Sequence, residues 1–219
     1  MNGRAVPRLA ALSGAGFFVL ATAGHFAYPS APDFMAKAPA VQAFYVAHHG
    51  AVLASNTLYL LSGMLLLVFA AALRAALRGD ERGELTATAV FGALIAGASM
   101  MIASSAVDMA GALHVQEQGT IAPQSASVFW DLNHVLFGLA APMALAVALL
   151  GCALASLRDH ALPSWLGAVS LVLGIALAIP PINYVAIVVF IFWSLAASIV
   201  LALPGEVDVS RLAGAAETG

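Results

Sequence analysis

The stretch INYVAIVVFIFWSLAASIVLAL, residues 182–203, contains no charged side chain and decides the fold class of this chain. A helix needs about 20 predominantly apolar residues to cross the hydrocarbon core of a bilayer. Lipid offers no hydrogen bonds to the backbone, so only helices and closed barrels can span it. The stretch lacks the apolar–polar alternation of barrel strands. It therefore predicts a transmembrane helix.

Five more largely uncharged stretches precede this one. Together they predict helices over residues 9–27, 49–75, 85–108, 129–157, 162–180 and 182–203. Pro180 and Pro181 separate the last two stretches, and Pro142 is expected to kink the fourth helix. We expect an all-α polytopic membrane protein, with one six-helix transmembrane domain over residues 1–203. Residues 204–219 would form a short cytoplasmic tail.

The overall composition agrees with a protein whose main partner is the lipid bilayer. Hydrophobic residues make up 62% of the chain, charged residues only 9%, and the mean hydropathy is +0.97. Soluble domains carry about 25% charged residues. No basic stripe or basic arm is present, which argues against nucleic-acid binding. Cys152 is the single cysteine, so an internal disulfide is excluded.

The basic residues give the orientation. With six crossings, seven of the eight Lys and Arg residues fall on one side of the membrane, and only Lys37 falls on the other. Positive charge concentrates in cytoplasmic loops, so we expect both termini to lie in the cytoplasm. The protein itself is expected to lie in the inner membrane of a bacterial cell. The seven residues on the predicted cytoplasmic side are Arg4, Arg8, Arg74, Arg78, Arg82, Arg158 and Arg211.

An alternative reading concerns the N-terminus. Arg4 and Arg8, followed by an apolar run and Ala21-Thr22-Ala23, are also compatible with a cleaved signal peptide. Cleavage would leave five helices and an outer N-terminus. The apolar run is longer than is usual for such a peptide, so we favour the uncleaved first helix.

The predicted outer loops are the longer ones. Within residues 28–46, the amphipathic piece Val41–Tyr45 is expected to lie along the membrane interface. Residues 109–128 are polar and are expected to form a second outer loop.

Polar residues gather towards the predicted outer side of the first four helices. Ionisable groups at membrane depth are costly and usually face the bundle interior or a wet cavity. His25, His49, Asp108 and His134 are the candidate metal ligands, and Asn56 and Asp131 are candidate supporting groups. His48 and His114 are expected to be solvated.

Several functions remain open for this cluster. We favour a non-enzymatic protein that binds a small ligand, ion or cofactor in an outward-facing polar pocket. A redox protein holding haem or a metal such as zinc is the first alternative. A transporter of a small solute or of protons is the second. A purely structural hydrogen-bonded cluster explains the same residues without any ligand.

Two short segments carry a resemblance. They are His25-Phe26-Ala27-Tyr28-Pro29, which leaves the first helix, and Leu162-Pro163-Ser164-Trp165-Leu166-Gly167, which opens the fifth. In layout the chain resembles the small six-helix membrane proteins of unknown function that are abundant in bacteria. The resemblance implies the fold and no activity.

Overall fold

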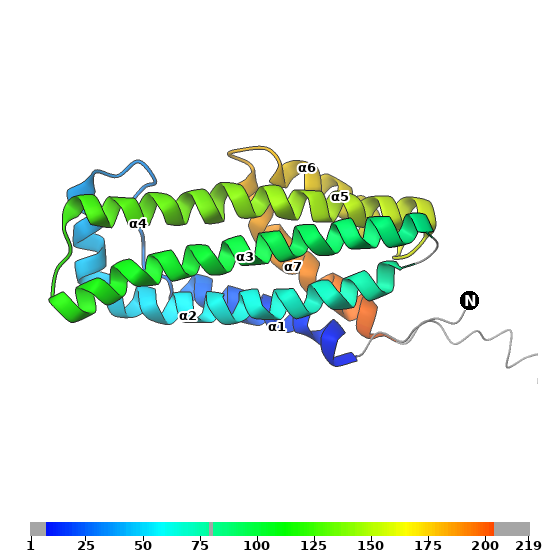
Figure 1. The fold of residues 1–219 in the computed structure, drawn as a ribbon, viewed down its shortest axis with the longest axis horizontal. Coiled ribbons are helices and arrows are strands. Elements are labelled where there is room, and N and C mark those ends of the chain that lie inside the picture. Colours follow the sequence, from blue (N-terminus) through cyan, green and yellow to red (C-terminus); the bar gives the residue numbers. More distant parts are fainter. Residues whose placement is uncertain (1–7, 79–80, 204–219) are drawn as a thin grey trace, which may run out of the picture.

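The computed structural model describes residues 8–78 and 81–203, and these form helices with no strand among them. The prediction of an all-α chain is confirmed. The predicted tail, residues 204–219, lies outside the described residues. The helices are α1 (Arg8–Ala27), α2 (Ala38–Leu77), α3 (Glu81–Gln118), α4 (Pro123–Val135), a π-helical turn (Leu136–Ala140), α5 (Ala141–Asp159), α6 (Ser164–Leu177) and α7 (Asn183–Ala202) (Figure 1).

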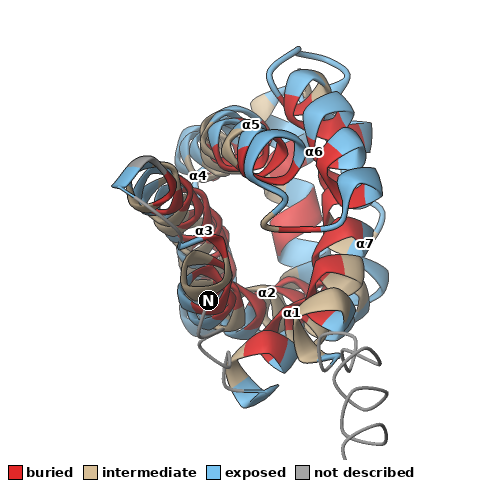
Figure 2. Cartoon of the chain, turned by 90° about the vertical axis from the view of Figure 1, so that its right-hand side faces the viewer, coloured by how far each residue is buried: buried red, intermediate tan, exposed pale blue. Residues whose placement is uncertain are grey.

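The helices close into a ring. Each packs against the next in the order α1, α2, α3, α5, α6 and α7, and α7 packs back against α1 (Figure 2). Large buried side chains from all six fill the interior, among them Phe17, Phe69, Leu94, Leu145, Leu173 and Phe190.

Small residues allow α1 and α7 to approach closely. The Ser198 hydroxyl on α7 donates to the carbonyl of Ala11, and the backbone N–H of Ala15 donates to the same hydroxyl at 3.1 Å. A methyl group at Gly14 would come within 3.0 Å of the Ser194 carbonyl oxygen on α7. Such contacts matter in a bilayer, where lipid provides no hydrophobic drive for helices to associate.

The irregularity expected at Pro142 takes the form of the π-helical turn. Proline has no N–H, so the carbonyl of Gly138, four residues earlier, loses its usual helical donor. The Asn183 side chain at the start of α7 supplies one, with Nδ2 2.6 Å from that carbonyl. A cross-helix hydrogen bond thus replaces the one that Pro142 removes.

Within residues 8–78 and 81–203, five helical segments are long and apolar enough to cross a membrane. The fifth predicted span, residues 162–180, is the one whose helix is shorter than this length. Its helix α6 has only 14 residues, about 21 Å at 1.5 Å per residue, against a hydrocarbon core of about 30 Å. Many large apolar side chains face outwards, including Val172, Val185 and Phe192, as lipid contact requires.

Two helices are much longer than the predicted spans. α2 has 40 residues and α3 has 38, which correspond to about 60 Å and 57 Å. Residues 109–118 are therefore helical, and the prediction of a loop over residues 109–128 is wrong for that part. α4 covers a further part of the same region, residues 123–128.

The extra turns of α2, α3 and α4 form a three-helix tip, comprising residues 38–54, 109–118 and 123–133. Figure 1 shows these three helices continuing past the points where α1, α6 and α7 end. The tip has its own core, centred on Tyr45, Val115 and Trp130. The piece Val41–Tyr45 belongs to this core and does not lie along an interface, since Val41 and Tyr45 are fully buried.

Candidate functional site

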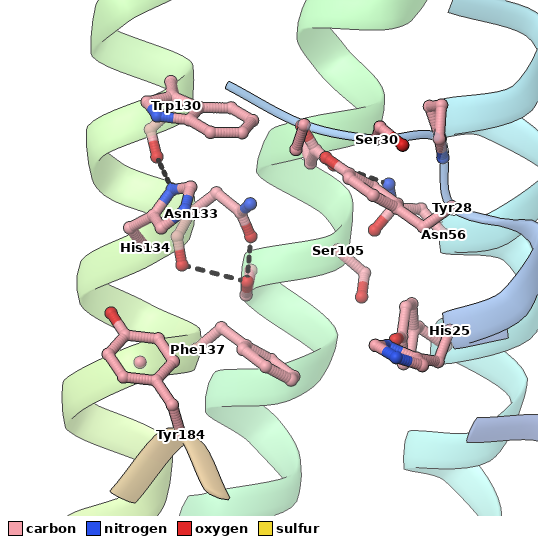
Figure 3. Close-up of a pocket in the computed structure, with 16 residues that line it drawn as sticks. His25, Tyr28, Ser30, Asn56, Ser105, Trp130, Asn133, His134, Phe137 and Tyr184 are labelled. Atoms are coloured by element: carbon pink, nitrogen blue, oxygen red, sulfur yellow. Dashed lines mark hydrogen bonds between the residues drawn. The ribbon is translucent and has the colours of Figure 1, made fainter. Parts of the chain in front are cut away.

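A cavity of about 460 Å³ lies where the three-helix tip meets the ring. Its walls come from the end of α1, the α1–α2 loop, α2, α3, α4, the π-helical turn and α7. We call this end of the bundle, which carries residues 28–37, the predicted outer end. Figure 3 shows Trp130, Asn133 and His134 on one wall, facing Tyr28, Asn56 and His25 on the other.

Asp108 of α3 is the most constrained polar group in the cavity wall. Its carboxylate is fully buried and accepts three hydrogen bonds. The donors are Tyr28 Oη at 2.8 Å, Tyr45 Oη at 2.5 Å and Asn56 Nδ2 at 2.7 Å. All three are neutral, and no Lys, Arg or His of the described residues forms an ion pair with Asp108.

Tyr28 follows α1 directly and holds the α1–α2 loop against the bundle. Burial, and then the neighbouring Asp108 carboxylate, raise the pKa of its hydroxyl well above the usual range. The hydroxyl therefore remains a neutral donor at physiological pH. Phe34, further along the loop, rests on the His134 ring with 5.1 Å between centroids. The loop thus covers part of the cavity.

His134 presents a defined ring nitrogen to its surroundings. Nδ1 lies 2.8 Å from the Trp130 carbonyl oxygen, which can only accept, so Nδ1 carries a proton. In the neutral ring, Nε2 is then the acceptor. The ring also packs on the Trp130 indole, at 4.3 Å between centroids. Trp130 is buried, and its indole N–H has no hydrogen-bond partner among the described residues.

A serine on α3 forms hydrogen bonds to α4 beside His134. The Ser104 hydroxyl is 3.1 Å from the carbonyl oxygen of Asn133 and also donates to the Asn133 side-chain oxygen. The amide of Asn133 is thereby fixed with its oxygen towards α3, and Figure 3 shows its nitrogen turned towards the cavity.

Aromatic side chains close the cavity on the side that faces the interior of the six-helix ring. Tyr59 and Phe137 meet edge to face with 6.1 Å between centroids. Tyr184 packs on Gly138, where a methyl group would lie 2.6 Å from the Tyr184 hydroxyl oxygen. Gly138 therefore makes room for Tyr184. Beyond these rings lies the apolar core of the bundle.

The structure brings some of the predicted site residues together and separates others. His25, Asn56, Asp108 and His134 line the cavity. His49 does not line it, and its Nδ1 lies 3.3 Å from the Val46 carbonyl oxygen on its own helix. Asp131, the second expected supporting group, is exposed and also lies outside the lining.

The four predicted metal ligands do not form one cluster. Within residues 8–78 and 81–203, no three or more His, Cys, Asp or Glu side chains are grouped closely enough to hold a metal ion. His25 and His134 lie on opposite walls of the cavity (Figure 3), and Asp108 is already engaged by three donors. The two residues expected to be solvated, His48 and His114, are both exposed, and the His48 ring also contacts Phe44 at 5.5 Å between centroids.

Sequence reasoning missed the aromatic part of the site. Tyr28 and Tyr45 hold Asp108, and Tyr59, Trp130 and Tyr184 line the cavity. The spacing of Tyr45 and Asn56 in the sequence contained one indication of this arrangement. Tyr45 and Asn56 are 11 residues apart, about three helical turns, so they share a face only if the second helix starts well before residue 49.

Comparison with known proteins finds no family model, no curated protein and no solved structure that matches this chain.

Proposed function

We propose that this chain is a six-helix integral membrane protein that binds a small organic ligand in its outward-facing cavity, without catalysing a reaction. One observation carries the proposal. A buried carboxylate, held by three neutral donors, forms part of an aromatic-lined cavity of about 460 Å³. Ligand sites are typically concave, mostly apolar, and furnished with a few placed polar groups.

The distribution of charge supports the proposed orientation. Arg74 and Arg78 near the end of α2 pair with Glu84 on α3, each at 3.0 Å, and Arg158 lies near the end of α5. These ends are opposite to the cavity. Positive residues favour the cytoplasmic side, so the cavity would face outwards and both termini would be cytoplasmic.

The geometry favours binding over transport or hydrolysis. Tyr59 and Phe137 separate the cavity from the apolar core of the bundle. The buried hydroxyls of Ser62, Ser170 and Ser194 in that core donate to backbone carbonyls of their own helices and so do not extend the cavity towards the opposite side. The Ser104 hydroxyl donates to Asn133, so it is not paired with a histidine base as an activated nucleophile would be.

The proposal can be tested with a substitution that fills the cavity. Ser105 is buried on α3 and lines the cavity, so Ser105→Phe should occupy ligand space. Ala106, the next residue, is exposed, and Ala106→Phe adds the same bulk outside the cavity. Melting temperatures of the two variants and the wild type are measured in uncharged detergent against a library of small amines, alcohols, amides and carboxylates.

We expect at least one compound to stabilise the wild type and Ala106→Phe but not Ser105→Phe. A ligand present at 100 times its Kd adds about 2.7 kcal/mol to the stability of the folded state. Equal shifts in Ser105→Phe, or no shift in any protein, would contradict the proposal. A visible absorption spectrum and elemental analysis of the same samples test the haem and metal alternatives.

A further inference from the structure

The charges around the cavity are unbalanced. Its lining contains one carboxylate, Asp108, and two histidines, His25 and His134, but no Lys or Arg. The described arginines of α2 and α5 lie at the opposite end of the bundle. An anionic ligand would therefore meet the Asp108 carboxylate without a compensating cation.

Asp108 has acceptor capacity left. An ionised carboxylate offers about four acceptor positions. Tyr28 and Asn56 donate to Oδ2, whereas Oδ1 receives only the Tyr45 hydroxyl. Neutral donors stabilise a buried charge but do not neutralise it, and burying an unpaired charge is costly. A positively charged group in the cavity beside this carboxylate would offset that cost.

The remaining walls suit an organic cation better than a metal ion. The rings of Tyr59, Phe137 and Tyr184 line the cavity, and aromatic faces attract ammonium groups. Hard metal cations need six or more oxygen ligands, or a near-octahedral set. No metal-binding group of side chains exists among the described residues.

His134 adds a second acceptor when its ring is neutral. Its Nε2 is free of the proton that Nδ1 carries towards Trp130, so it can accept from an N–H group. The cavity thus combines a carboxylate, an imidazole acceptor and aromatic faces. An ammonium group with an attached apolar body complements all of them.

We propose that the ligand of this cavity is a small organic amine in its ammonium form, paired with Asp108 and enclosed by the aromatic rings. This inference rests on the proposed ligand-binding function and specifies the class of ligand.

Three probes of matched shape test the inference: 2-phenylethylammonium, the neutral 2-phenylethanol and the phenylacetate anion. Binding to the full chain in uncharged detergent is followed by melting temperature and by tryptophan fluorescence, since Trp130 lines the cavity. We expect the ammonium probe to bind at least about tenfold more tightly than the alcohol, equivalent to about 1.4 kcal/mol. Phenylacetate should bind more weakly than either.

Two variants locate the selectivity. Asp108→Asn should reduce the affinity for the ammonium probe about tenfold and leave the affinity for the alcohol nearly unchanged. Because Asp108→Asn risks misfolding, Tyr59→Leu provides a second test through the aromatic contact. It should weaken ammonium binding several-fold and alcohol binding less.

The outcomes separate this inference from the proposed function. If the alcohol or phenylacetate binds as tightly as the ammonium probe, the amine assignment is overturned while ligand binding stands. If no probe binds, the amine assignment is overturned as well. The library screen on Ser105→Phe and Ala106→Phe then decides independently whether the cavity binds small molecules at all.

Discussion

At the scale of single residues, Asp108 shows how a carboxylate can be fully buried at the predicted outer end. Its partners come from three places in the chain: the loop after α1, the first turns of α2 and the middle of α2. Each donor also ties its own segment to α3. Tyr28 anchors the loop, Tyr45 anchors the three-helix tip, and Asn56 anchors the middle of α2. The carboxylate is thus both the polar centre of the cavity and a structural junction.

The Tyr45 hydroxyl gives a direct test of that junction. Tyr45→Phe removes one buried donor and keeps the ring in the tip core. Leaving a buried acceptor short of a partner costs about 1–3 kcal/mol, and more for a charged group. We expect a clearly lower melting temperature in detergent.

Tyr184→Phe is the matched control for Tyr45→Phe. Tyr184 is half exposed, with 47% of its surface accessible. We expect its melting temperature to stay close to that of the wild type. If both variants melt alike, the Tyr45–Asp108 hydrogen bond does not hold the tip.

At the scale of helices, Pro142 and Asn183 form a matched pair. Pro142 deprives the Gly138 carbonyl of a donor, and Asn183 supplies one from α7. Asn183→Leu alone should destabilise the protein by about 1–3 kcal/mol, because the carbonyl stays buried and unpaired. Pro142→Ala restores an N–H that can reach the same carbonyl.

The double variant Pro142→Ala/Asn183→Leu tests this coupling. It should recover much of the stability lost in Asn183→Leu, since the restored N–H replaces the Asn183 amide. Thermal or chemical unfolding of the four proteins gives a double-mutant cycle with an expected coupling of about 0.5–3 kcal/mol. Strictly additive effects would mean that Asn183 does not compensate for Pro142.

The helix ends show what hydropathy can and cannot predict. The expected ends at residues 27 and 75 lie close to the observed ones, at Ala27 and Leu77. In contrast, α3 continues ten residues past the expected end at 108, to Gln118. Hydropathy indicates contact with lipid, and it does not indicate that residues 109–118 continue the helix. Their helical state depends on packing against α2 and α4, which no local pattern contains.

The same limit explains how far the site could be predicted. His25, Asn56, Asp108 and His134 stood out because polar groups are rare in apolar stretches. Tyr45 did not stand out, because tyrosine is common at membrane interfaces and has an ordinary explanation there. Its role follows from the start of α2 at Ala38, which places it over Asp108.

At the scale of the whole molecule, the cavity lies at the level where the bundle changes from six helices to three. α1, α6 and α7 end near this level, while α2, α3 and α4 continue into the tip (Figure 1). On the side where α1, α6 and α7 end, the α1–α2 loop covers part of the cavity, through Tyr28 and Phe34. A ligand from the proposed outer side would therefore enter beside this loop and would not need to displace a spanning helix.

The proposed orientation can be tested by thiol labelling. Cys152 is buried and is the single cysteine, so Cys152→Ala provides a background without thiols. Ser30→Cys then places a thiol on the exposed α1–α2 loop, and Asp159→Cys places one at the exposed end of α5. In intact spheroplasts, a membrane-impermeant maleimide should label Ser30→Cys and leave Asp159→Cys unlabelled.

Permeabilised cells supply the control, because both thiols should then react to a similar extent. The reverse pattern in intact spheroplasts would invert the topology and turn the cavity towards the cytoplasm. Labelling of both thiols without permeabilisation would place residues 30 and 159 on one side, which requires an even number of crossings between them. The α2, α3 and α4–α5 segments between these positions give three crossings, so that result would overturn the six-helix topology itself.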